Sequence, residues 1–313
     1  MLRKIRTILA AVMFVLITLL FLDFTGTLHH WLGWVAKIQF LPALLALNVG
    51  VVVALVVLTL VFGRIYCSVI CPLGIMQDII SWLNKKKNRF SHSPEKRWLR
   101  YGVLVVFVAA FLLGINSIVA LLAPYSSYGR IAQNLLKPIY EAGNNVLAFF
   151  AEHMNSYTFY SVDIWIRSLP TFIIAVATLL VIGYLAWRGG RTYCNTICPV
   201  GTILSFLARF SWLKISFSED KCKKCGRCAR NCKASAIDFK SMTVDYSRCV
   251  VCGNCLGMCS FDSLHYIHPS DSRHSEAEAP QQTPDTGRRS FLIGGTLAVA
   301  GAALAQEKKK VDG

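Results

Sequence analysis

The chain has 313 residues, of which 54% are hydrophobic and 16% charged, and its mean hydropathy is +0.48. This composition is too apolar for a single water-soluble domain and is typical of a membrane protein with several spans. The formal net charge is +16, but the Lys and Arg residues cluster beside apolar runs, where they set topology and contact anionic lipid, so no nucleic-acid partner is expected.

Four apolar runs without charged residues predict membrane spans. They cover Thr7–Leu22, Leu41–Phe62, Tyr101–Ala123 and Leu169–Trp187. At about 1.5 Å per residue, each run approaches or exceeds the hydrocarbon thickness of about 30 Å. The first run follows Arg3, Lys4 and Arg6 and has no small-x-small cleavage site after it, so we expect a span rather than a cleaved signal peptide.

Basic residues predict the orientation of these spans. The connection Asn84–Arg100 carries seven Lys or Arg residues, and Arg188 and Arg191 follow the fourth run. The connection between the first two runs has only Lys37, and the loop predicted over Pro124–Ser168 balances its cations with acids. The positive-inside rule therefore places the N-terminus and the segment after the fourth span in the cytoplasm, with the chain in a bacterial inner membrane.

Two copies of a short motif mark an internal repeat. Residues 63–74 read GRIYCSVICPLG and residues 190–201 read GRTYCNTICPVG, so eight positions of twelve match at an offset of 127. Each copy follows a predicted two-span unit and precedes an apolar stretch suited to a helix at the membrane interface. Residues 1–212 are therefore predicted to form an all-α membrane domain of two parallel repeats, with both motifs on the cytoplasmic face near a pseudo-two-fold axis.

Residues 67–72 and 194–199 are here named the elbows, and their thiol-bearing residues are the elbow cysteines, Cys67, Cys71, Cys194 and Cys198. The proline after each second cysteine disfavours helix before it, which predicts thiols at helix ends. Three interpretations stay open for them: ligands of a further metal centre, a reversible dithiol, and small residues buried near a turn. Because the pair recurs within an otherwise divergent repeat, metal or redox chemistry is favoured.

Eight further cysteines form two runs in the C-terminal part. Each run reads Cys-x-x-Cys-x-x-Cys-x-x-x-Cys, and sixteen residues separate them. In proteins with two [4Fe–4S] clusters, the fourth cysteine of such a run ligates the other cluster. The first predicted ligand set is therefore Cys222, Cys225, Cys228 and Cys259, and the second is Cys249, Cys252, Cys255 and Cys232.

Two other uses of these cysteines are less well supported. Zinc sites usually take two separated cysteine pairs rather than four cysteines within eleven residues, and a disulfide framework is disfavoured in a reducing compartment. The segment 213–267 resembles a bacterial two-cluster ferredoxin, which implies a small α+β domain. It departs from that family at Lys233 and Ser260, where proline commonly follows the fourth cysteine, but no ligand is lost.

The last part of the chain has a different composition. Residues 268–287 are rich in Pro, Ser, Glu and Gln, which predicts a flexible linker. Residues 288–313 contain Arg288-Arg289 and Ala303-Leu304-Ala305 and resemble a twin-arginine signal with its cleavage site. Two interpretations stay open: a signal for an exported domain of a longer polypeptide, and a fifth span.

The order of four spans, two elbows and a double cluster motif resembles NapH-type membrane quinol dehydrogenases of periplasmic nitrate reductase systems, over residues 1–266. It is also similar to the C-terminal half of NosR-type proteins. The resemblance implies a subunit that passes electrons from the quinone pool through two [4Fe–4S] clusters towards a periplasmic iron–sulfur or haem acceptor. It does not locate the quinol pocket. Candidates are Tyr66, Tyr193, Arg64 and Arg191, for which anchoring at the membrane interface is the favoured role.

Two other functions stay open. In the first, the chain is an accessory polyferredoxin for metalloenzyme maturation, whose elbows handle copper or iron and whose clusters reduce the metal. In the second, the chain is a membrane anchor with redox-silent clusters. Reduction of the clusters by quinol would favour the electron-transfer function over both of these alternatives.

Overall fold

The computed structural model describes residues 2–23, 26–84, 90, 92–93, 95–153, 160–163, 168–218 and 221–268. All of these residues belong to one unit, Met1–Ser275. The predicted twin-arginine-like segment, and the predicted linker apart from His268, lie outside the described residues.

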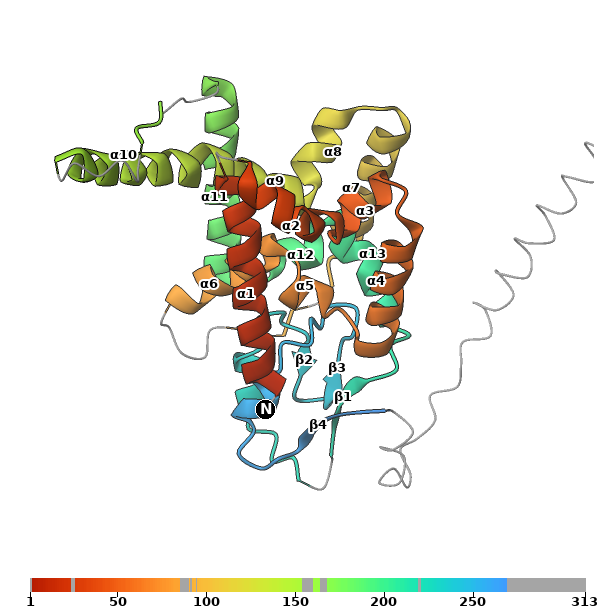
Figure 1. Ribbon diagram of the computed structural model, residues 1–313. Coiled ribbons are helices and arrows are strands. Elements are labelled where there is room, and N and C mark those ends of the chain that lie inside the picture. The colour runs from red at the N-terminus through yellow and green to blue at the C-terminus, as the bar shows by residue number, and fades with distance from the viewer. Residues whose placement is uncertain are drawn as a thin grey trace, which may run out of the picture. The chain divides into compact units, whose positions relative to one another are not determined.

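Helices make up the first two thirds of the chain. They are α1 (Leu2–Leu22), α2 (Thr27–Lys37), α3 (Phe40–Leu45), α4 (Val49–Phe62), α5 (Tyr66–Val69), α6 (Pro72–Leu83), α7 (Arg97–Leu112), α8 (Asn116–Leu122), α9 (Pro124–Ile131), the π-helical turn η1 (Ala132–Leu136), α10 (Lys137–His153), α11 (Leu169–Gly189), α12 (Thr192–Thr196) and α13 (Pro199–Ala208). Among the described helices, α1 and α11, of 21 residues each, are long and apolar enough to cross a membrane. Figure 1 shows the strands at the end of α1 that carries its N-terminus.

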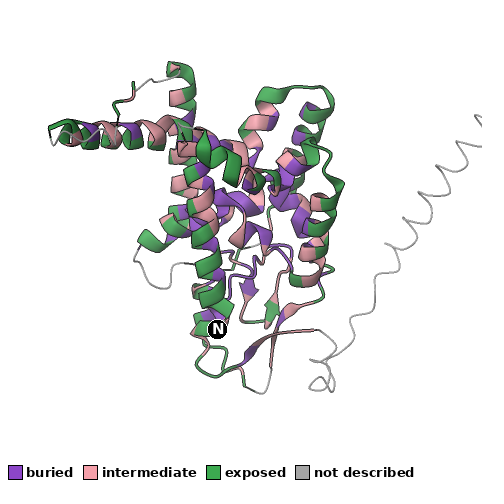
Figure 2. Cartoon of the chain, viewed as in Figure 1, coloured by how far each residue is buried: buried purple, intermediate pink, exposed green. Residues whose placement is uncertain are grey.

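The outer faces of the long helices are apolar. Leu9 and Val12 of α1 are each 50% exposed, and Leu180 of α11 is 67% exposed. Figure 2 shows buried residues gathered around α5, α12 and the start of α13, while α1 and α4 have exposed outer faces. Large contiguous apolar surfaces on a protein mark contact with lipid or with partner proteins. Together with the two long apolar helices, this surface indicates a membrane protein.

The second and third expected spans are not continuous helices. The run Leu41–Phe62 is divided between α3 and α4, because Leu47 adopts a left-handed conformation and the side chain of Asn48 caps α4. The run Tyr101–Ala123 is divided between α7 and α8 at Gly114, whose φ of 72° ends α7. A hydropathy pattern does not register these local turns, which is why each run reads as one span in the sequence.

Two further expectations concern the connections between the spans. The connection Pro124–Ser168, predicted as a loop, consists largely of α9, η1 and α10 in its described part, because charge counts do not report helical periodicity. The stretches predicted as interface helices form α6 and α13, which bury Leu73 and Leu204 in the interior while Trp82 and Phe206 are exposed. One face of each helix therefore packs against protein, and their position at a membrane interface stays a prediction.

Short strands and helical turns form the C-terminal part, named here the cysteine-rich domain. Its elements are β1 (Lys214–Phe217), α14 (Arg227–Arg230), β2 (Ile237–Asp238), β3 (Thr243–Val244), α15 (Asn254–Met258) and β4 (Leu264–Ile267). β1 pairs antiparallel with β4, so that Lys214 lies opposite Ile267, and β2 pairs antiparallel with β3. The first pairing joins the two ends of the segment predicted to be ferredoxin-like.

Candidate functional site

In each elbow, a short helix is followed directly by a longer one. Cys67 lies in α5 and Cys71 is the N-cap of α6, while Cys194 lies in α12 and Cys198 is the N-cap of α13. The proline after each N-cap occupies the first position of the new helix, where a backbone N–H would have no intrahelical partner. The thiols therefore lie at helix ends, as the position of the prolines predicts.

The elbow cysteines come together in the interior. Each of them is 3–4% exposed. Burial raises the pKa of the Cys194 thiol to about 11, although Arg191 lowers it, and the Cys67 thiol of the other elbow also raises it. Cys198 likewise interacts electrostatically with Cys71 and Cys67. The two elbows thus bring their thiols into one group.

Hydrogen-bond donors face these sulfurs. Gln77 Nε2 donates to Cys194 Sγ over 3.3 Å, and Gly201 N–H donates to Cys198 Sγ over 3.3 Å. Such donors favour the thiolate, the form in which cysteine binds a metal. Gln77 Oε1 and Arg64 Nε are buried and have no hydrogen-bond partner among the described residues. Orphaned polar atoms beside four thiols fit a site that holds a further group.

Arg64 and Arg191, here named the elbow arginines, each lie three residues before an elbow and donate a hydrogen bond to the opposite elbow. Arg64 Nη2 donates to Cys194 O over 3.1 Å, and Arg191 Nη1 donates to Cys67 O over 2.5 Å. Both arginine side chains are fully buried, so the role of interface anchor predicted for them is wrong. Their charges instead lie beside the thiols and would offset the negative charge of thiolates. The same correction applies to the two tyrosines predicted with them, since both are buried: Tyr66 and Tyr193.

Asp78 of α6 is a site residue that the sequence analysis does not single out. Arg191 Nε and Nη2 each donate to its carboxylate over 2.9 Å, Arg6 Nη1 donates over 3.1 Å, and Lys233 Nζ lies 3.6 Å away. Burial alone would raise the pKa of Asp78, but Arg191, Lys233 and Arg6 outweigh burial and hold the pKa well below its usual range. A lone acid within the apolar stretch after the first elbow was the available signal.

The first predicted ligand set lies at the surface of the cysteine-rich domain and is named the outer set. One small cavity is lined by all four of its members, Cys222, Cys225, Cys228 and Cys259. Cys225 is exposed. Burial alone would raise the pKa of Cys259, but hydrogen bonds from Ser263 outweigh burial and lower it. The structure thus brings the fourth cysteine of the second run to the first three of the first run.

The second predicted ligand set is more enclosed and is named the inner set. Its members are Cys232, Cys249, Cys252 and Cys255, of which Cys249 is half-buried and the others are buried. Burial raises the pKa of Cys232 to about 11, with a further contribution from Cys252, and that of Cys249 to about 12, with a further contribution from Cys232. Cys255 interacts electrostatically with the other three. The four cysteines of this set therefore lie near one another, and their role as ligands of one cluster stays a prediction.

The two cysteine runs have the same backbone conformation. Left-handed residues occur at three matched pairs of positions: Lys224 and Val251, Gly226 and Gly253, Ser235 and Asp262. Such conformations can turn N–H groups towards an anion. The sulfur of the fourth cysteine in each run accepts a hydrogen bond from the backbone N–H four residues later. Ala236 N–H donates to Cys232 Sγ over 3.5 Å, and Ser263 N–H donates to Cys259 Sγ over 3.4 Å. The backbone therefore suits anionic clusters held by thiolates.

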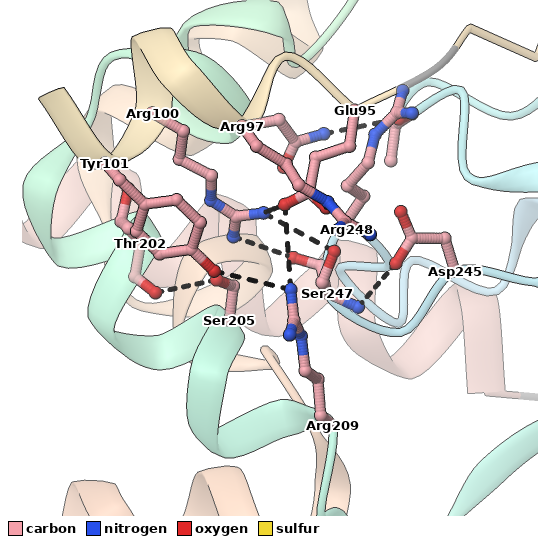
Figure 3. Close-up of polar contacts among 12 residues, drawn as sticks. Glu95, Arg97, Arg100, Tyr101, Thr202, Ser205, Arg209, Asp245, Ser247 and Arg248 are labelled. Carbon is pink, nitrogen blue, oxygen red and sulfur yellow. Dashed lines mark hydrogen bonds and ion pairs between the residues drawn. The ribbon is translucent and has the colours of Figure 1, made fainter. Parts of the chain in front are cut away.

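A polar network attaches the cysteine-rich domain to the helices beside the inner set. Ser247, two residues before Cys249, accepts hydrogen bonds through its carbonyl from Arg64 Nη1 over 3.0 Å and Arg100 Nη2 over 3.1 Å. Figure 3 shows Arg100 pointing towards both Ser247 and Glu95. The Arg100 guanidinium lies 2.5 Å from the Glu95 carboxylate. Through Arg64, this network reaches the elbow thiols.

The second elbow and the residues just before it contact the segment that follows Cys232. Arg191 N–H donates to Lys233 O over 2.9 Å, and Asn195 Nδ2 donates to Ala234 O over 3.2 Å. Both carbonyls directly follow Cys232 in the chain. Gly190 has a φ of 67°, and a Cβ at this position would lie 2.4 Å from Lys233 O. Glycine is therefore required where the second elbow meets the cysteine-rich domain.

Four thiols in each of three groups are a donor set for iron–sulfur clusters. Among the described residues, no group of three or more His, Cys, Asp or Glu side chains is placed to hold a single metal ion. A [4Fe–4S] cluster makes a different demand, because its four cysteines bind separate iron atoms and their sulfurs need not meet at one point. The elbow, inner and outer groups each supply the required number of thiols.

Family comparisons assign iron–sulfur binding to both parts of the chain. A family described as "4Fe-4S binding domain" matches residues 44–89 and 169–218, which contain the two elbows. A second family with the same description matches residues 214–237, which contain the first cysteine run. Both the elbow region and the cysteine-rich domain are therefore similar to 4Fe-4S binding domains. No solved structure matches the chain significantly.

Several curated relatives are named as ferredoxin-type or electron-transport proteins. The chain is 27% identical to the "putative electron transport protein YccM" of Escherichia coli over 85% of this chain and 65% of YccM. It is 27% identical to the "ferredoxin-type protein NapH" of E. coli over 71% of this chain and 68% of NapH. For the "methylamine utilization ferredoxin-type protein MauN" of Paracoccus denitrificans, the identity is 24% over 63% of this chain and 57% of MauN. Over most of its length, this chain is therefore similar to ferredoxin-type proteins of the NapH and MauN kind.

Proposed function

We propose that the chain takes electrons from membrane quinol and passes them through iron–sulfur clusters towards a periplasmic acceptor. The observation that carries this proposal is the position of Arg64, which donates to Cys194 O in the opposite elbow and to Ser247 O beside the inner set. This buried side chain holds the elbow thiols and the inner set in one rigid arrangement, and a redox site needs such support. The names of the relatives, electron-transport and ferredoxin-type proteins, support the same role.

The outer and inner sets are proposed to ligate one [4Fe–4S] cluster each. The grouping of the thiols and the matched left-handed backbone positions support this assignment. When bound, each cluster supplies a one-electron acceptor and donor, so that two clusters match the two electrons of a quinol. The residues of this chain hold the thiolates in place, keep the inner set away from water and fix it against the elbows.

The elbow cysteines are proposed to hold a further iron–sulfur centre. Their burial, the donors that face their sulfurs, and the match of a 4Fe-4S family to both elbows support this centre. Arg64 and Arg191 would offset its negative charge. Of the three interpretations left open by the sequence, a metal centre is the one that these observations favour.

The four-span arrangement, with two parallel repeats and a cytoplasmic cysteine-rich domain, belongs to this proposal. The basic N-terminal turn of α1 supports the orientation, because Arg3 approaches Gly253 of the cysteine-rich domain: a Cβ on Gly253 would lie 3.6 Å from Arg3 Cα. The first turn of α1 and the cysteine-rich domain are therefore on the same side. If the positive-inside rule holds, both are cytoplasmic. The broken helices α3–α4 and α7–α8 would then complete the second and third spans.

Iron analysis of anaerobically purified protein tests the ligand sets. We expect about twelve irons and as many labile sulfides per chain if all three sets hold [4Fe–4S] clusters, and about eight if the elbows hold none. Cys194→Ser should remove about four irons from the elbow, and Cys225→Ser about four from the outer set. Stoichiometric zinc in place of iron would contradict the proposal.

Reduction by quinol tests the reaction. Adding a reduced quinol to membranes should bleach the visible absorption of the clusters, and oxidised quinone should not. If Cys194→Ser removes metal but leaves this reduction intact, the elbows lie outside the electron path and the metalloenzyme-maturation role becomes the better explanation. If quinol bleaches no cluster in the intact protein, electron transfer from quinol is ruled out.

A further inference from the structure

A cavity of about 710 Å³ lies between α1, α6 and the cysteine-rich domain. Its walls have two different halves. Apolar side chains of α1 and α6 line one half: Ala10, Phe14, Val15, Ile75 and Ile79. Polar side chains line the other half: Arg3, Arg6, Asp78, Arg230 and Lys233. The cavity is therefore suited to an amphiphile that has an apolar tail and a polar head.

The polar half carries an excess of positive charge. Among the described lining residues, four Arg or Lys side chains accompany one acidic side chain, that of Asp78. Asp78 is already engaged by Arg6, Arg191 and Lys233, so its carboxylate cannot neutralise the remaining cations. Arg6 is 8% exposed, and its Nε has no hydrogen-bond partner among the described residues. An oxygen-bearing head group would supply the missing acceptor.

The polar half also lies beside the inner set. Lys233 follows Cys232 in the chain, and Asn254, another lining residue, precedes Cys255. The wall of the cavity thus includes residues adjacent to two ligands of the inner set, and Met258, which precedes Cys259 of the outer set, also lines it. Transfer of electrons from a bound molecule to the inner set requires such proximity, whereas binding of a lipid head group does not.

We propose that this cavity binds a membrane quinol, with the hydroquinone ring beside Arg6 and Lys233 and the isoprenoid chain along the apolar side chains of α1 and α6. This inference rests on the proposed function and gives it a binding site. A phenolic hydroxyl has an ordinary pKa of about 10. Nearby cations favour its deprotonated form, so the excess charge of the cavity would assist loss of the two quinol protons to water. The two electrons released as the quinol becomes quinone would pass one at a time to the clusters. Asp78 is a positioning residue in this site, because it orients Arg6 and Lys233.

The earlier candidates for the pocket lie elsewhere. Tyr66, Tyr193, Arg64 and Arg191 are not among the residues that line the cavity. They lie beside the elbow thiols instead, and Arg191 donates to both carboxylate oxygens of Asp78, to which Arg6 also donates. The cavity and the elbow are therefore neighbouring sites that share one carboxylate.

Binding of 2-heptyl-4-hydroxyquinoline N-oxide, a fluorescent quinol analogue, tests the proposal on the full-length protein in nanodiscs. Ala11 lines the cavity, whereas Val12, the next residue on the same helix, does not and is 50% exposed. Ala11→Trp should fill the cavity and weaken binding by about tenfold or more, while the matched control Val12→Trp should change it by less than about twofold. Arg6→Gln should also weaken binding, because it removes a donor and a charge from the head-group half.

Iron content and the visible spectrum of each variant show whether the clusters remain intact. If intact Ala11→Trp protein binds the analogue as well as the unmodified protein does, while quinol still bleaches the clusters, the pocket assignment is overturned and the proposed function stands. If the analogue binds in an Ala11-dependent way but quinol bleaches no cluster, the binding site stands and the proposed electron transfer falls.

A phospholipid in the cavity is the other occupant that the charges allow. Its contribution is measured by comparing nanodiscs of pure phosphatidylcholine with nanodiscs that contain phosphatidylglycerol, and by counting the lipids that copurify with each variant. Loss of bound phosphatidylglycerol in Ala11→Trp, with unchanged binding of the quinol analogue, would overturn the proposal. Displacement of the analogue by quinone in both nanodiscs is the expected result.

Discussion

The inner and outer cysteine sets have nearly the same backbone but very different surroundings. Both runs place left-handed residues at matched positions and direct an N–H to the sulfur of the fourth cysteine. The outer set has an exposed member, Cys225. The inner set is flanked by carbonyls at Ser247 and Lys233 that accept hydrogen bonds from the two elbow arginines. The same local motif can therefore serve two roles, decided by what is packed against it.

The largest expected effect comes from removing one ligand from each set. Cys252→Ser should abolish reduction of the remaining clusters by quinol, because Lys233 and Asn254, which adjoin two inner-set cysteines, line the proposed quinol cavity. Cys225→Ser should remove about the same amount of iron but leave reduction of the inner cluster intact. Absorption and electron paramagnetic resonance spectra recorded after addition of quinol measure the reduction of the remaining clusters in the two variants. Equal losses of reduction in the two variants would remove the functional distinction between the sets.

A second variant tests the charged junction behind the inner set. Arg191→Ala leaves Asp78 buried with fewer partners, and breaking a buried ion pair in this way typically costs about 3–5 kcal/mol. Arg188→Ala, nearby and exposed, removes only a hydrogen bond to the Tyr184 hydroxyl and should cost about 0–1 kcal/mol. Unfolding curves in detergent compare the two. Similar small losses of unfolding free energy in the two variants would mean that the junction does not stabilise the inner set.

A third pair of variants tests the attachment at Ser247. Arg100 is 1% exposed at its side chain and Arg97 is 69% exposed, yet both contact Glu95. Arg100→Gln should loosen the segment around Ser247 by about 1–3 kcal/mol, since it leaves a buried carboxylate with one partner fewer, whereas Arg97→Gln should have little effect. Hydrogen exchange of residues 245–255 measures the local stability. Equal exchange in both variants would show that Arg100 does not fasten the domain.

The smallest effect concerns pH. Because the pKa of Asp78 is lowered in the folded protein, its ion pairs contribute fully above the ordinary aspartate pKa of about 3.9 and are lost only as the pH falls further. The difference in unfolding temperature between the unmodified protein and Asp78→Asn should therefore stay constant between about pH 8 and about pH 5. A difference that shrinks within this range would mean that Asp78 takes up a proton there.

Patterns that depend on spacing were the ones that the sequence could predict. The crossed grouping of the cysteines follows from two runs of identical spacing, and the position of the elbow thiols follows from the prolines. Local turns at Leu47 and Gly114 were not predictable from hydropathy, because one residue with positive φ divides an apolar run without changing its composition. As a result, the four-span count stays a proposal.

The polar junction was also beyond the sequence. Arg6, Asp78, Arg191 and Lys233 are separated by tens of residues, and nothing in their spacing connects them until the chain is folded. Arg64 and Arg191 were noticed because they recur in the repeat, but their burial reversed the role expected of them. Long-range pairing of charges depends on tertiary packing, whereas a metal motif is largely local.

The exchange of hydrogen bonds between the elbows has a consequence for biosynthesis. Arg64 donates hydrogen bonds to oxygen atoms of Cys194, Asn195 and Ser247, which the ribosome adds more than a hundred residues later. Until then, a nascent chain would hold an unpaired guanidinium at the membrane boundary, where an uncompensated charge resists burial. The packing around Arg64 therefore requires both halves of the chain, and the iron–sulfur centre proposed at the elbows would be loaded only after synthesis of the second half.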